Sequence, residues 1–379
     1  MVLTNAIIVD ENFKLRECDL RIEGEKITEI GEDLSDGEVL NLSGRYILPG
    51  FIDTHLHGAY GTRLSGDKDV DLSKITRFEV TQGVTGFTIT TAATEFGGLL
   101  AEINRAVISA LDEPKGAKIL GIHAEGPFLN PKRKGAMNAD NIIAPDVEKL
   151  KAMISHGKGF LKLITIAPEM PGAPELIRYA VANGLKVSLG HTDATFEEAQ
   201  AGIRAGATEA THTFNAMRPY NHREPGVLGA VLLSDEITCE MICDYVHLHP
   251  ATCELIYCLK GADRIRMVSD SGHAAGMDIT EFEVNGITRY VKDGVIRLAD
   301  GTIAGSAKTL LDGVKNLLRA GVPMGEVAKM TSYNPARCLK LEQQVGSIAV
   351  GKCADLVVLN EVYEVEYTFV NGKCVYRKK

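Results

Sequence analysis

The sequence predicts an α/β protein: a (β/α)8 barrel with a small β-sandwich domain formed by both ends of the chain. The ends alternate short β-like runs with turns, whereas the middle alternates short apolar runs with helical patterns. Repeated strand–helix units are typical of a parallel sheet. In addition, His, Glu and Asp residues recur where the predicted strands end, which is the rim where such barrels build active sites.

The two ends of the chain resemble each other in pattern. Residues 1–47 contain "NAIIVD", "CDLRIEGEKITEIG" and "EVLNLSG", separated by Gly and Asp turns. Residues 340–379 contain "GSIAVGKCADLVVLN" and "EVEYTFVNGKCVYR", and Asn371-Gly372 is a strong hairpin signal. We therefore expect the two ends to meet in one small β-sandwich.

Residues 48–339 have a different period. Short apolar runs such as "VTGFTITTA", "FLKLITIAPE" and "RIRMVSDS" alternate with helical patterns such as "APELIRYAVANG" and "TFEEAQAGIRAG". About seven or eight such units favour a closed (β/α)8 barrel over an open sheet. The stretch 282–305 interrupts this pattern, and we interpret it as a β-hairpin inserted near the end of the barrel.

Composition excludes several classes of function. The chain has 379 residues, 24% of them charged, and a net charge of -9. This acidic balance argues against a nucleic-acid or anionic-membrane partner. The sequence has no apolar run long enough for a membrane span and no secretory signal pattern, so we expect a cytoplasmic protein with eight free cysteines. Cys239 and Cys243 are interpreted as buried small side chains rather than metal ligands.

The heptapeptide "FIDTHLH" places Asp53, His55 and His57 at alternate positions of an otherwise apolar strand. Alternate residues of a strand project to the same side, so both imidazoles can bind one metal. A hydrogen-bonded pair of core histidines is the alternative. Glu125 before a Gly-Pro turn and Asp270 as a helix cap are similarly ambiguous when each is considered alone.

Considered together, these residues favour a metal site. Each of several consecutive predicted strands has a His, Glu or Asp residue at its C-terminal end. Imidazoles combined with carboxylates suit Zn or Fe. A bound cation would also compensate the cost of burying them. The strand-end residues are His55, His57, His123, Glu125, His191, His212, Asp244, His247 and Asp270.

Several motifs carry a family resemblance: "PGFIDTHLHG", "HAEGPFLN", "GHTDAT", "THTFNAM", "HREPGVLG", "VSDSGHAAG" and "IAGSAKTLLDGV". Together they resemble the amidohydrolase superfamily and, more narrowly, the N-acetylglucosamine-6-phosphate deacetylase family, over nearly the whole chain. The resemblance implies a metal-bearing (β/α)8 barrel, a β-sandwich formed by both termini, and usually a homodimer. It also implies hydrolysis of N-acetylglucosamine 6-phosphate to glucosamine 6-phosphate and acetate.

The resemblance further implies roles for individual residues. Glu125, His191 and His212 match metal ligands, and Asp270 matches the catalytic acid/base. His55 and His57 match a second metal site that some members have. We therefore expect one or two divalent ions, Zn being preferred and Fe the alternative, with Glu125 bridging two ions when both bind.

Substrate contacts are also implied by the resemblance. We expect Arg223 in "NHREPG" to bind the phosphate through its paired donors, and His247 to donate a hydrogen bond to the developing oxyanion. In family dimers both would reach the partner subunit's substrate. An ordinary surface ion pair is the alternative for Arg223. The other expected substrate contacts are Ala136, Met137, Asn215, Ala216, Ile303, Ala304 and Gly305.

Alternative functions remain open at this point. Met137 stands where relatives commonly carry a histidine that contacts the sugar, so N-acetylgalactosamine 6-phosphate is an alternative substrate. A D-aminoacylase-like or dihydroorotase-like amidohydrolase is a second alternative, although no lysine is placed to bridge two metals. A non-catalytic barrel is disfavoured because every expected ligand and Asp270 are present. His273 is close enough in sequence to orient Asp270.

Overall fold

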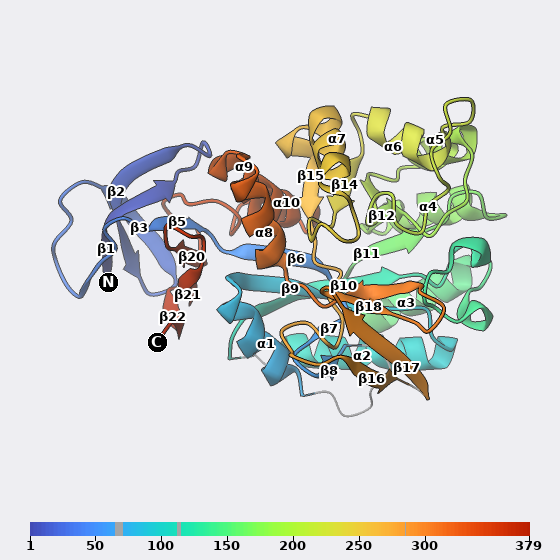
Figure 1. The fold of residues 1–379 in the computed structure, drawn as a ribbon, viewed down its shortest axis with the longest axis horizontal. Helices are drawn as coiled ribbons and strands as arrows, with labels where there is room; N and C mark the ends of the chain where they lie inside the picture. The colour runs from blue at the N-terminus through green and yellow to red at the C-terminus, as the bar shows by residue number, and fades with distance from the viewer. Residues whose placement is uncertain (65–70, 112–114, 285) are drawn as a thin grey trace.

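The computed structural model describes residues 1–64, 71–111, 115–284 and 286–379. Its two main bodies are a large barrel surrounded by helices and a smaller β-sheet that contains both termini (Figure 1). This architecture confirms the predicted fold class. No helix among the described residues is long and apolar enough to cross a bilayer.

The small body is one eight-stranded sheet built from both ends of the chain. Five N-terminal strands join three C-terminal strands, in the order β22-β21-β20-β5-β1-β2-β3 with β4 beside β1. The junction is antiparallel pairing between β5 and β20. The strands are β1 (Val2–Val9), β2 (Leu15–Glu23), β3 (Lys26–Gly31), β4 (Val39–Asn41), β5 (Tyr46–Pro49), β20 (Leu356–Leu359), β21 (Val365–Val370) and β22 (Lys373–Arg377).

The predicted hairpin lies between β21 and β22. Asn371 and Gly372 have φ angles of 49° and 73°. Positive φ at both central residues is what a two-residue type I′ turn requires, and Asn-Gly adopts it readily. The sheet also has its own hydrophobic core, which includes Leu3, Ile8, Leu20, Ile47, Leu356, Val358 and Phe369.

The barrel consists of eight parallel strands in the order β15-β14-β13-β12-β11-β10-β9-β6. The ring closes through a parallel bridge from Leu56 to Ser271 and a hydrogen bond from the Asp270 N–H to the His55 carbonyl at 3.0 Å. The strands are β6 (Phe51–Leu56), β9 (Val84–Thr91), β10 (Lys118–Glu125), β11 (Leu161–Ile166), β12 (Lys186–Leu189), β13 (Glu209–Ala210), β14 (Thr238–Met241) and β15 (Ile265–Met267).

Helices follow the barrel strands and cover them. The chain returns through α1 (Leu72–Thr81), α2 (Phe96–Leu111), α3 (Val147–Gly157), α4 (Ala173–Ala182), α5 (Phe196–Arg204), α6 (Gly226–Leu233), α7 (Pro250–Lys260), α8 (Leu310–Arg319), α9 (Met324–Ala328) and α10 (Asn334–Cys338). Shorter helical turns are η1 (Pro131–Arg133), η2 (Ala139–Asn141), η3 (Ala262–Arg264) and η4 (Lys329–Tyr333).

The start of α5 is stabilised by a cap. The N-cap residue is Thr195, which forms a capping box with Glu198. The reciprocal bonds need partners three positions apart in the sequence, as Thr195 and Glu198 are. Asp193, two residues before the cap, accepts a hydrogen bond from Arg133 at 2.6 Å.

The stretch expected to form a hairpin is a four-stranded antiparallel sheet, in the order β16-β17-β18-β19. It returns to the barrel at Ser306, whose N–H donates to the Asp270 carbonyl at 2.9 Å. The insertion thus joins the barrel beside the last strand end. Its strands are β16 (Glu281–Val284), β17 (Ile287–Lys292), β18 (Val295–Arg297) and β19 (Ile303–Ser306), and a separate ribbon pairs β7 (Gly58–Ala59) with β8 (Thr62–Arg63).

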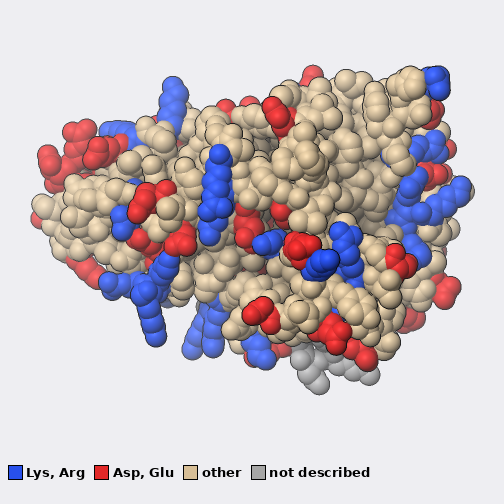
Figure 2. All heavy atoms as spheres, viewed as in Figure 1, with Lys and Arg blue, Asp and Glu red and all other residues tan. Residues whose placement is uncertain are grey.

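All eight cysteines are free thiols, as expected, and Cys239 and Cys243 are buried. On the face seen in Figure 2, charged side chains of both signs are intermingled, while the area over α6 and α7 is largely uncharged. The division of the chain into 1–47 with 340–379 and 48–339 stays a prediction. The small sheet extends slightly beyond the predicted boundary at residue 47, because its strand β5 ends at Pro49.

Candidate active site

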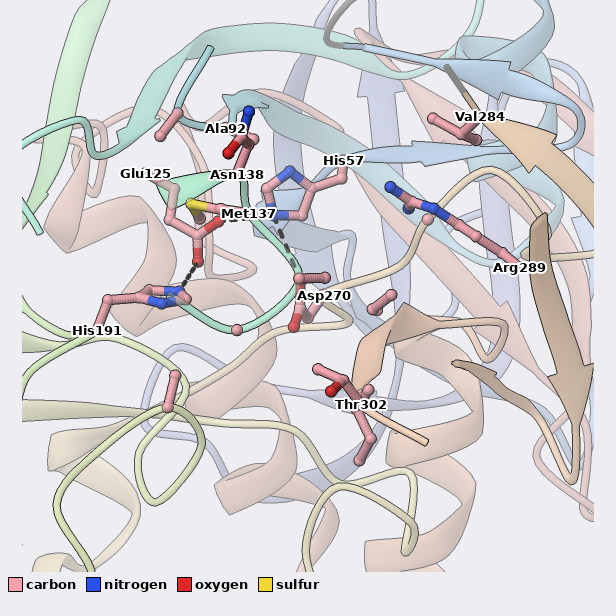
Figure 3. Close-up of a pocket in the computed structure, with 18 of the residues that line it drawn as sticks. His57, Ala92, Glu125, Met137, Asn138, His191, Asp270, Val284, Arg289 and Thr302 are labelled. Atoms are coloured by element: carbon pink, nitrogen blue, oxygen red, sulfur yellow. Dashed lines mark hydrogen bonds and ion pairs between the residues drawn. The ribbon is translucent and has the colours of Figure 1, made fainter. Parts of the chain in front are cut away.

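Strand ends of the barrel converge on one pocket of about 530 Å³. Glu125 is the last residue of β10, and His57 follows β6 directly. His191, His212 and Asp270 follow β12, β13 and β15 within a few residues. Parallel strands bring their carboxyl ends to the same edge, so residues far apart in sequence meet here. Figure 3 shows Glu125, His57, His191 and Asp270 facing a common centre.

One side of Glu125 faces two imidazoles. Glu125 Oε1 lies 3.0 Å from both His191 Nε2 and His212 Nε2, and these two nitrogens are 3.1 Å apart. His191 Nδ1 donates a hydrogen bond to the Arg133 carbonyl at 2.7 Å. The Nε2 atom of His191 therefore carries the lone pair that can bind a cation. Ligand atoms of a tetrahedral Zn site lie about 3.3 Å apart, given bonds of ~2.0–2.1 Å. This triad therefore fits a divalent cation.

A second pair of imidazoles meets the same carboxylate. His57 Nε2 lies 3.2 Å from Glu125 Oε2, and His55 Nε2 lies 3.4 Å from Glu125 Oε1. His55 Nε2 and His57 Nε2 are 3.1 Å apart. Two groups that can each hold a metal ion therefore share Glu125. Burial alone would raise the pKa of Glu125, but the neighbouring imidazoles, His191 and then His55, hold it well below its usual value.

Glu240 on β14 fixes the orientation of His55. Its Oε2 lies 2.9 Å from His55 Nδ1, and because a carboxylate only accepts, His55 must donate from Nδ1. The free lone pair of His55 is thereby placed on Nε2, facing Glu125 and His57. In metal centres, a carboxylate typically accepts a hydrogen bond from the ring nitrogen that does not bind the metal. The same Oε2 accepts from the backbone N–H of His212 at 3.0 Å.

A further geometric cluster of His55, His123 and Glu240 does not fit a metal ion. Both ring nitrogens of His123 are already engaged, with the Thr54 carbonyl at 3.2 Å and Thr165 Oγ1 at 2.9 Å. Burial lowers the pKa of His123 to about 3, so the ring is neutral. His123 therefore serves as a satisfied core histidine beneath the site.

Glu240 belongs to a chain of buried charges inside the barrel. Arg266 on β15 is fully buried, and its guanidinium lies 2.7 Å from Glu240 Oε1 and 3.5 Å from Glu209 Oε2. Removing one member of such a chain leaves an uncompensated buried charge. The orientation of His55 thus depends on Arg266, deep in the barrel.

The backbone at the site is unusual. His191, His212 and Asp270 have φ angles of 47°, 26° and 49°, and Phe214 and Ala216 have 81° and 51°. Left-handed conformations of non-glycine residues cost about 1–3 kcal/mol each and concentrate at functional sites. Three of the residues that surround the pocket centre are therefore held in orientations that ordinary strand or helix backbone would not provide.

Asp270 and His247 lie on the pocket wall. Asp270 Oδ1 is 3.5 Å from His57 Nε2 and 3.7 Å from His55 Nε2. His247 Nδ1 bonds Asp244 Oδ2 at 2.7 Å, and its Nε2 is buried without a protein partner. Burial would lower the pKa of His247, but the hydrogen bond and charge of Asp244 raise it above its usual value. In its protonated form, which Asp244 favours, His247 can donate from Nε2 into the pocket.

The expected residues divide into two groups. Arg223 is exposed, does not line this pocket, and has its Nη1 3.0 Å from His222 Nε2. His55 is fully buried and is not among the residues that line the pocket. His247 lines the pocket of its own chain, and its reach to a partner's site stays a prediction. The remaining expected residues all line the pocket: His57, Glu125, Ala136, Met137, His191, His212, Asn215, Ala216, Asp270, Ile303, Ala304 and Gly305.

Comparisons with known proteins agree with this geometry. The amidohydrolase family matches residues 46–375. The N-acetylglucosamine-6-phosphate deacetylase of Lysinibacillus sphaericus is 34% identical over 98% of this chain and 97% of its own length. The chain belongs to the amidohydrolase family. Both the superfamily resemblance and the narrower one seen in the sequence are confirmed.

Two further relatives bear on the substrate of this amidohydrolase. A solved structure of a variant N-acetyl-D-glucosamine-6-phosphate deacetylase from Mycobacterium smegmatis, in complex with N-acetyl-D-glucosamine-6-phosphate, is 32% identical. It has a TM-score of 0.90 and covers 99% of each chain. The N-acetylgalactosamine-6-phosphate deacetylase of Escherichia coli O157:H7 is 32% identical over 86% of this chain and 87% of its own length.

The pocket of this amidohydrolase also contains residues that sequence reasoning missed. Arg63, Arg289 and Thr302 line it, and His273, left undecided from the sequence, lines it too and stacks on Phe282 at 4.8 Å. In Figure 3, Arg289 extends from the inserted sheet toward His57. Nothing in the local sequence distinguishes these residues. The inserted sheet brings Arg289 and Thr302 to the barrel rim, and the β7–β8 ribbon brings Arg63 there.

Replacing Glu240 tests the second cation position. We expect Glu240→Gln to weaken metal binding at the His55–His57 pair by about 10–100-fold, because His55 loses its charged partner. Isothermal titration with Zn²⁺ after chelation, together with elemental analysis, measures this directly. Glu209→Gln is the matched control, since Glu209 contacts Arg266 but not His55. Equal zinc affinities in the two variants would contradict the assignment.

Proposed function

We propose that this chain hydrolyses the N-acetyl group of N-acetylglucosamine 6-phosphate, giving glucosamine 6-phosphate and acetate. The observation that carries the proposal is the position of Asp270, 3.5 Å from His57 Nε2 beside the Glu125 cluster and in one pocket with His247. A carboxylate next to a cation-binding cluster and opposite a hydrogen-bond donor suits amide hydrolysis. The names of the relatives at 32–34% identity support the same reaction.

We propose Zn²⁺ as the cofactor, with Fe²⁺ as the alternative and one or two ions per chain. The Glu125–His191–His212 triad would hold the first ion and the His55–His57–Glu125 triad the second. Imidazole and carboxylate donors suit these metals. When bound, such a cation supplies Lewis-acid activation of water and neutralises developing negative charge.

The protein side chains then have distinct tasks. Asp270 accepts the proton of the attacking water and passes it to the departing amine nitrogen, since one carboxyl group can act as base and then as acid. His247 donates from Nε2 to the acetamide oxygen as negative charge develops on it. Asp244 holds His247 for this task. Its Oδ1 accepts from the backbone N–H of His247 at 2.8 Å, and its Oδ2 accepts from Ser306 at 3.1 Å.

Deacetylation of N-acetylgalactosamine 6-phosphate is the second candidate. Met137 lines the pocket, and a thioether cannot donate a hydrogen bond to a sugar hydroxyl. The relative from Escherichia coli O157:H7 carries that epimer in its name. A D-aminoacylase-like activity is less favoured, because Glu125 already occupies the bridging position between the two clusters.

We also propose that the chain forms a homodimer and is cytoplasmic. Exposed apolar side chains lie on α6, on α7 and in the loop before α6: Tyr220, Leu233, Leu255 and Leu259 are 59%, 71%, 47% and 44% exposed. Exposed apolar side chains of this kind suit a subunit interface. Tyr220 lies in the same loop as Arg223, so a partner there would meet that residue. Eight free thiols suit a reducing compartment.

Acetate release tests the proposed reaction. We expect the zinc-loaded protein to release acetate from N-acetylglucosamine 6-phosphate, and chelation followed by zinc addition to abolish and restore it. The two comparison substrates are N-acetylgalactosamine 6-phosphate and unphosphorylated N-acetylglucosamine. Preference for the epimer would keep the mechanism and attribute the change to Met137. No acetate from any of the three, with zinc bound, would contradict the proposal.

The role of Asp270 is tested by Asp270→Asn. We expect kcat to fall by about 10²–10⁴-fold, because the amide cannot accept and return a proton. Zinc content should stay at the wild-type level, as measured by elemental analysis. A variant that keeps full activity would show that another group performs the proton transfer.

Sedimentation tests the dimer. We expect the wild-type protein to sediment at twice its chain mass of 40.9 kDa. A double variant, Leu255→Glu with Leu259→Glu, should sediment as a monomer, because two charges would be buried at the interface. Ile108→Glu on α2, another exposed apolar position at 67%, is the control and should remain dimeric. A double variant of unchanged mass would place the interface elsewhere.

A further inference from the structure

His191 is held in place through both its ring and its backbone. Its φ angle is 47°, and a left-handed conformation of this kind persists only where the surroundings enforce it. The ring nitrogen Nδ1 donates to the Arg133 carbonyl, which directs Nε2 at Glu125 (Figure 3). The backbone carbonyl of His191 accepts a hydrogen bond from the N–H of Asn130 at 3.0 Å. The orientation of this ligand therefore depends on the segment between Asn130 and Arg133.

That segment is the short helical turn η1. Asn130 precedes the turn, and its Oδ1 atom accepts a hydrogen bond from the Lys132 N–H at 2.9 Å. The Arg133 N–H donates to the Asn130 carbonyl, also at 2.9 Å. A turn of this length has few internal hydrogen bonds, so it does not fix its own position. Whatever holds the Asn130 side chain therefore also holds the Arg133 carbonyl against His191.

Glu169 holds that side chain. It lies three residues after β11, is half-buried and is not among the residues that line the pocket. Its Oε1 atom accepts hydrogen bonds from Asn130 Nδ2 at 2.8 Å and from the Asp193 N–H at 2.6 Å. Its Oε2 atom accepts a hydrogen bond from Thr192 Oγ1 at 2.6 Å. One carboxylate therefore joins η1 to the two residues that follow His191.

A direct ion pair closes the network around His191. The Arg133 guanidinium donates twice to Asp193 Oδ1, at 2.9 and 2.6 Å, so η1 is also tied to the loop that follows His191. Hydrogen bonds to a carboxylate are about twice as strong as those between neutral groups. Because Glu169 accepts three such bonds, its removal would loosen η1 and the His191 loop together.

We propose that Glu169 is a positioning residue for the first cation, which the Glu125–His191–His212 triad would hold. It keeps His191 in the ion-binding conformation, although it lies outside the pocket. This inference rests on the cation site proposed above and not on the identity of the sugar. Glu240 has the corresponding task for His55. The two triads thus depend on different carboxylates, one inside the barrel and one in the loops at its rim.

Zinc titration of Glu169→Gln tests this role. The measurement is made in a His57→Ala background, which leaves the first triad intact. We expect the dissociation constant for Zn²⁺ in calorimetry to rise about 10–100-fold, because the amide nitrogen of glutamine cannot accept a hydrogen bond. Glu198→Gln is the matched control. Glu198 accepts hydrogen bonds from Thr195 at the start of α5 rather than from η1, so its zinc affinity should equal that of the background.

A second background shows whether the effect passes through His191. His191→Ala leaves the His55–His57–Glu125 triad, and there we expect Glu169→Gln to leave the zinc affinity unchanged. Residues that act through one another show such non-additive effects, whereas independent sites add. An equal loss of affinity in both backgrounds would overturn the inference, by showing that Glu169 supports the barrel rim in general.

Asn130→Ala is the second variant, which keeps the carboxylate and removes its link to η1. We expect it to weaken zinc binding in the His57→Ala background in the same direction as Glu169→Gln. Unchanged zinc affinity in both variants would overturn the inference. A loss confined to the His57→Ala background supports it even when the wild type releases no acetate, because the titration uses no substrate. Absence of acetate release would contradict the proposed function alone.

Discussion

Glu125 is the group on which the site depends. Its carboxylate lies within 3.4 Å of four imidazole Nε2 atoms, those of His55, His57, His191 and His212. Four lone pairs converging on one buried carboxylate would be unstable without positive charge among them. A divalent cation supplies that charge, and the parallel barrel supplies the convergence, because each ligand follows a different strand. The proposed chemistry, the pocket and the position of Asp270 all follow from this arrangement.

The barrel interior supports that arrangement at a distance. Glu209, Arg266 and Glu240 form a row of alternating charges inside the barrel, and Glu240 in turn contacts His55 at the site. The four residues come from β13, β15, β14 and β6. In an apolar barrel core, hydrocarbon side chains would pack equally well but could not select a ring tautomer. The buried ion pairs therefore contribute geometric specificity at the metal-binding cluster, a use for which buried polar networks are suited.

The sequence could predict those features that depend on neighbouring residues or on the general geometry of a parallel barrel. The strand-end histidines and Glu125 were identified because a parallel barrel places all strand ends on one rim, whatever their separation in the chain. The hairpin at Asn371-Gly372 was predicted as well, since two adjacent residues determine the conformation of this turn. Arg289 was missed, because its approach to His57 depends on the fold of the insertion. Glu240 was missed as well, because it lies within β14 and not at a strand end.

The shared sheet of the two termini has a consequence for biosynthesis. β5 emerges from the ribosome with one edge unpaired, and its partner β20 follows roughly 300 residues later, about 15–60 s at ~5–20 residues per second. An open strand edge of that kind can pair with other nascent chains. The whole barrel is therefore synthesised before β5 gains this partner. The small sheet is completed only when β20, β21 and β22 have been made.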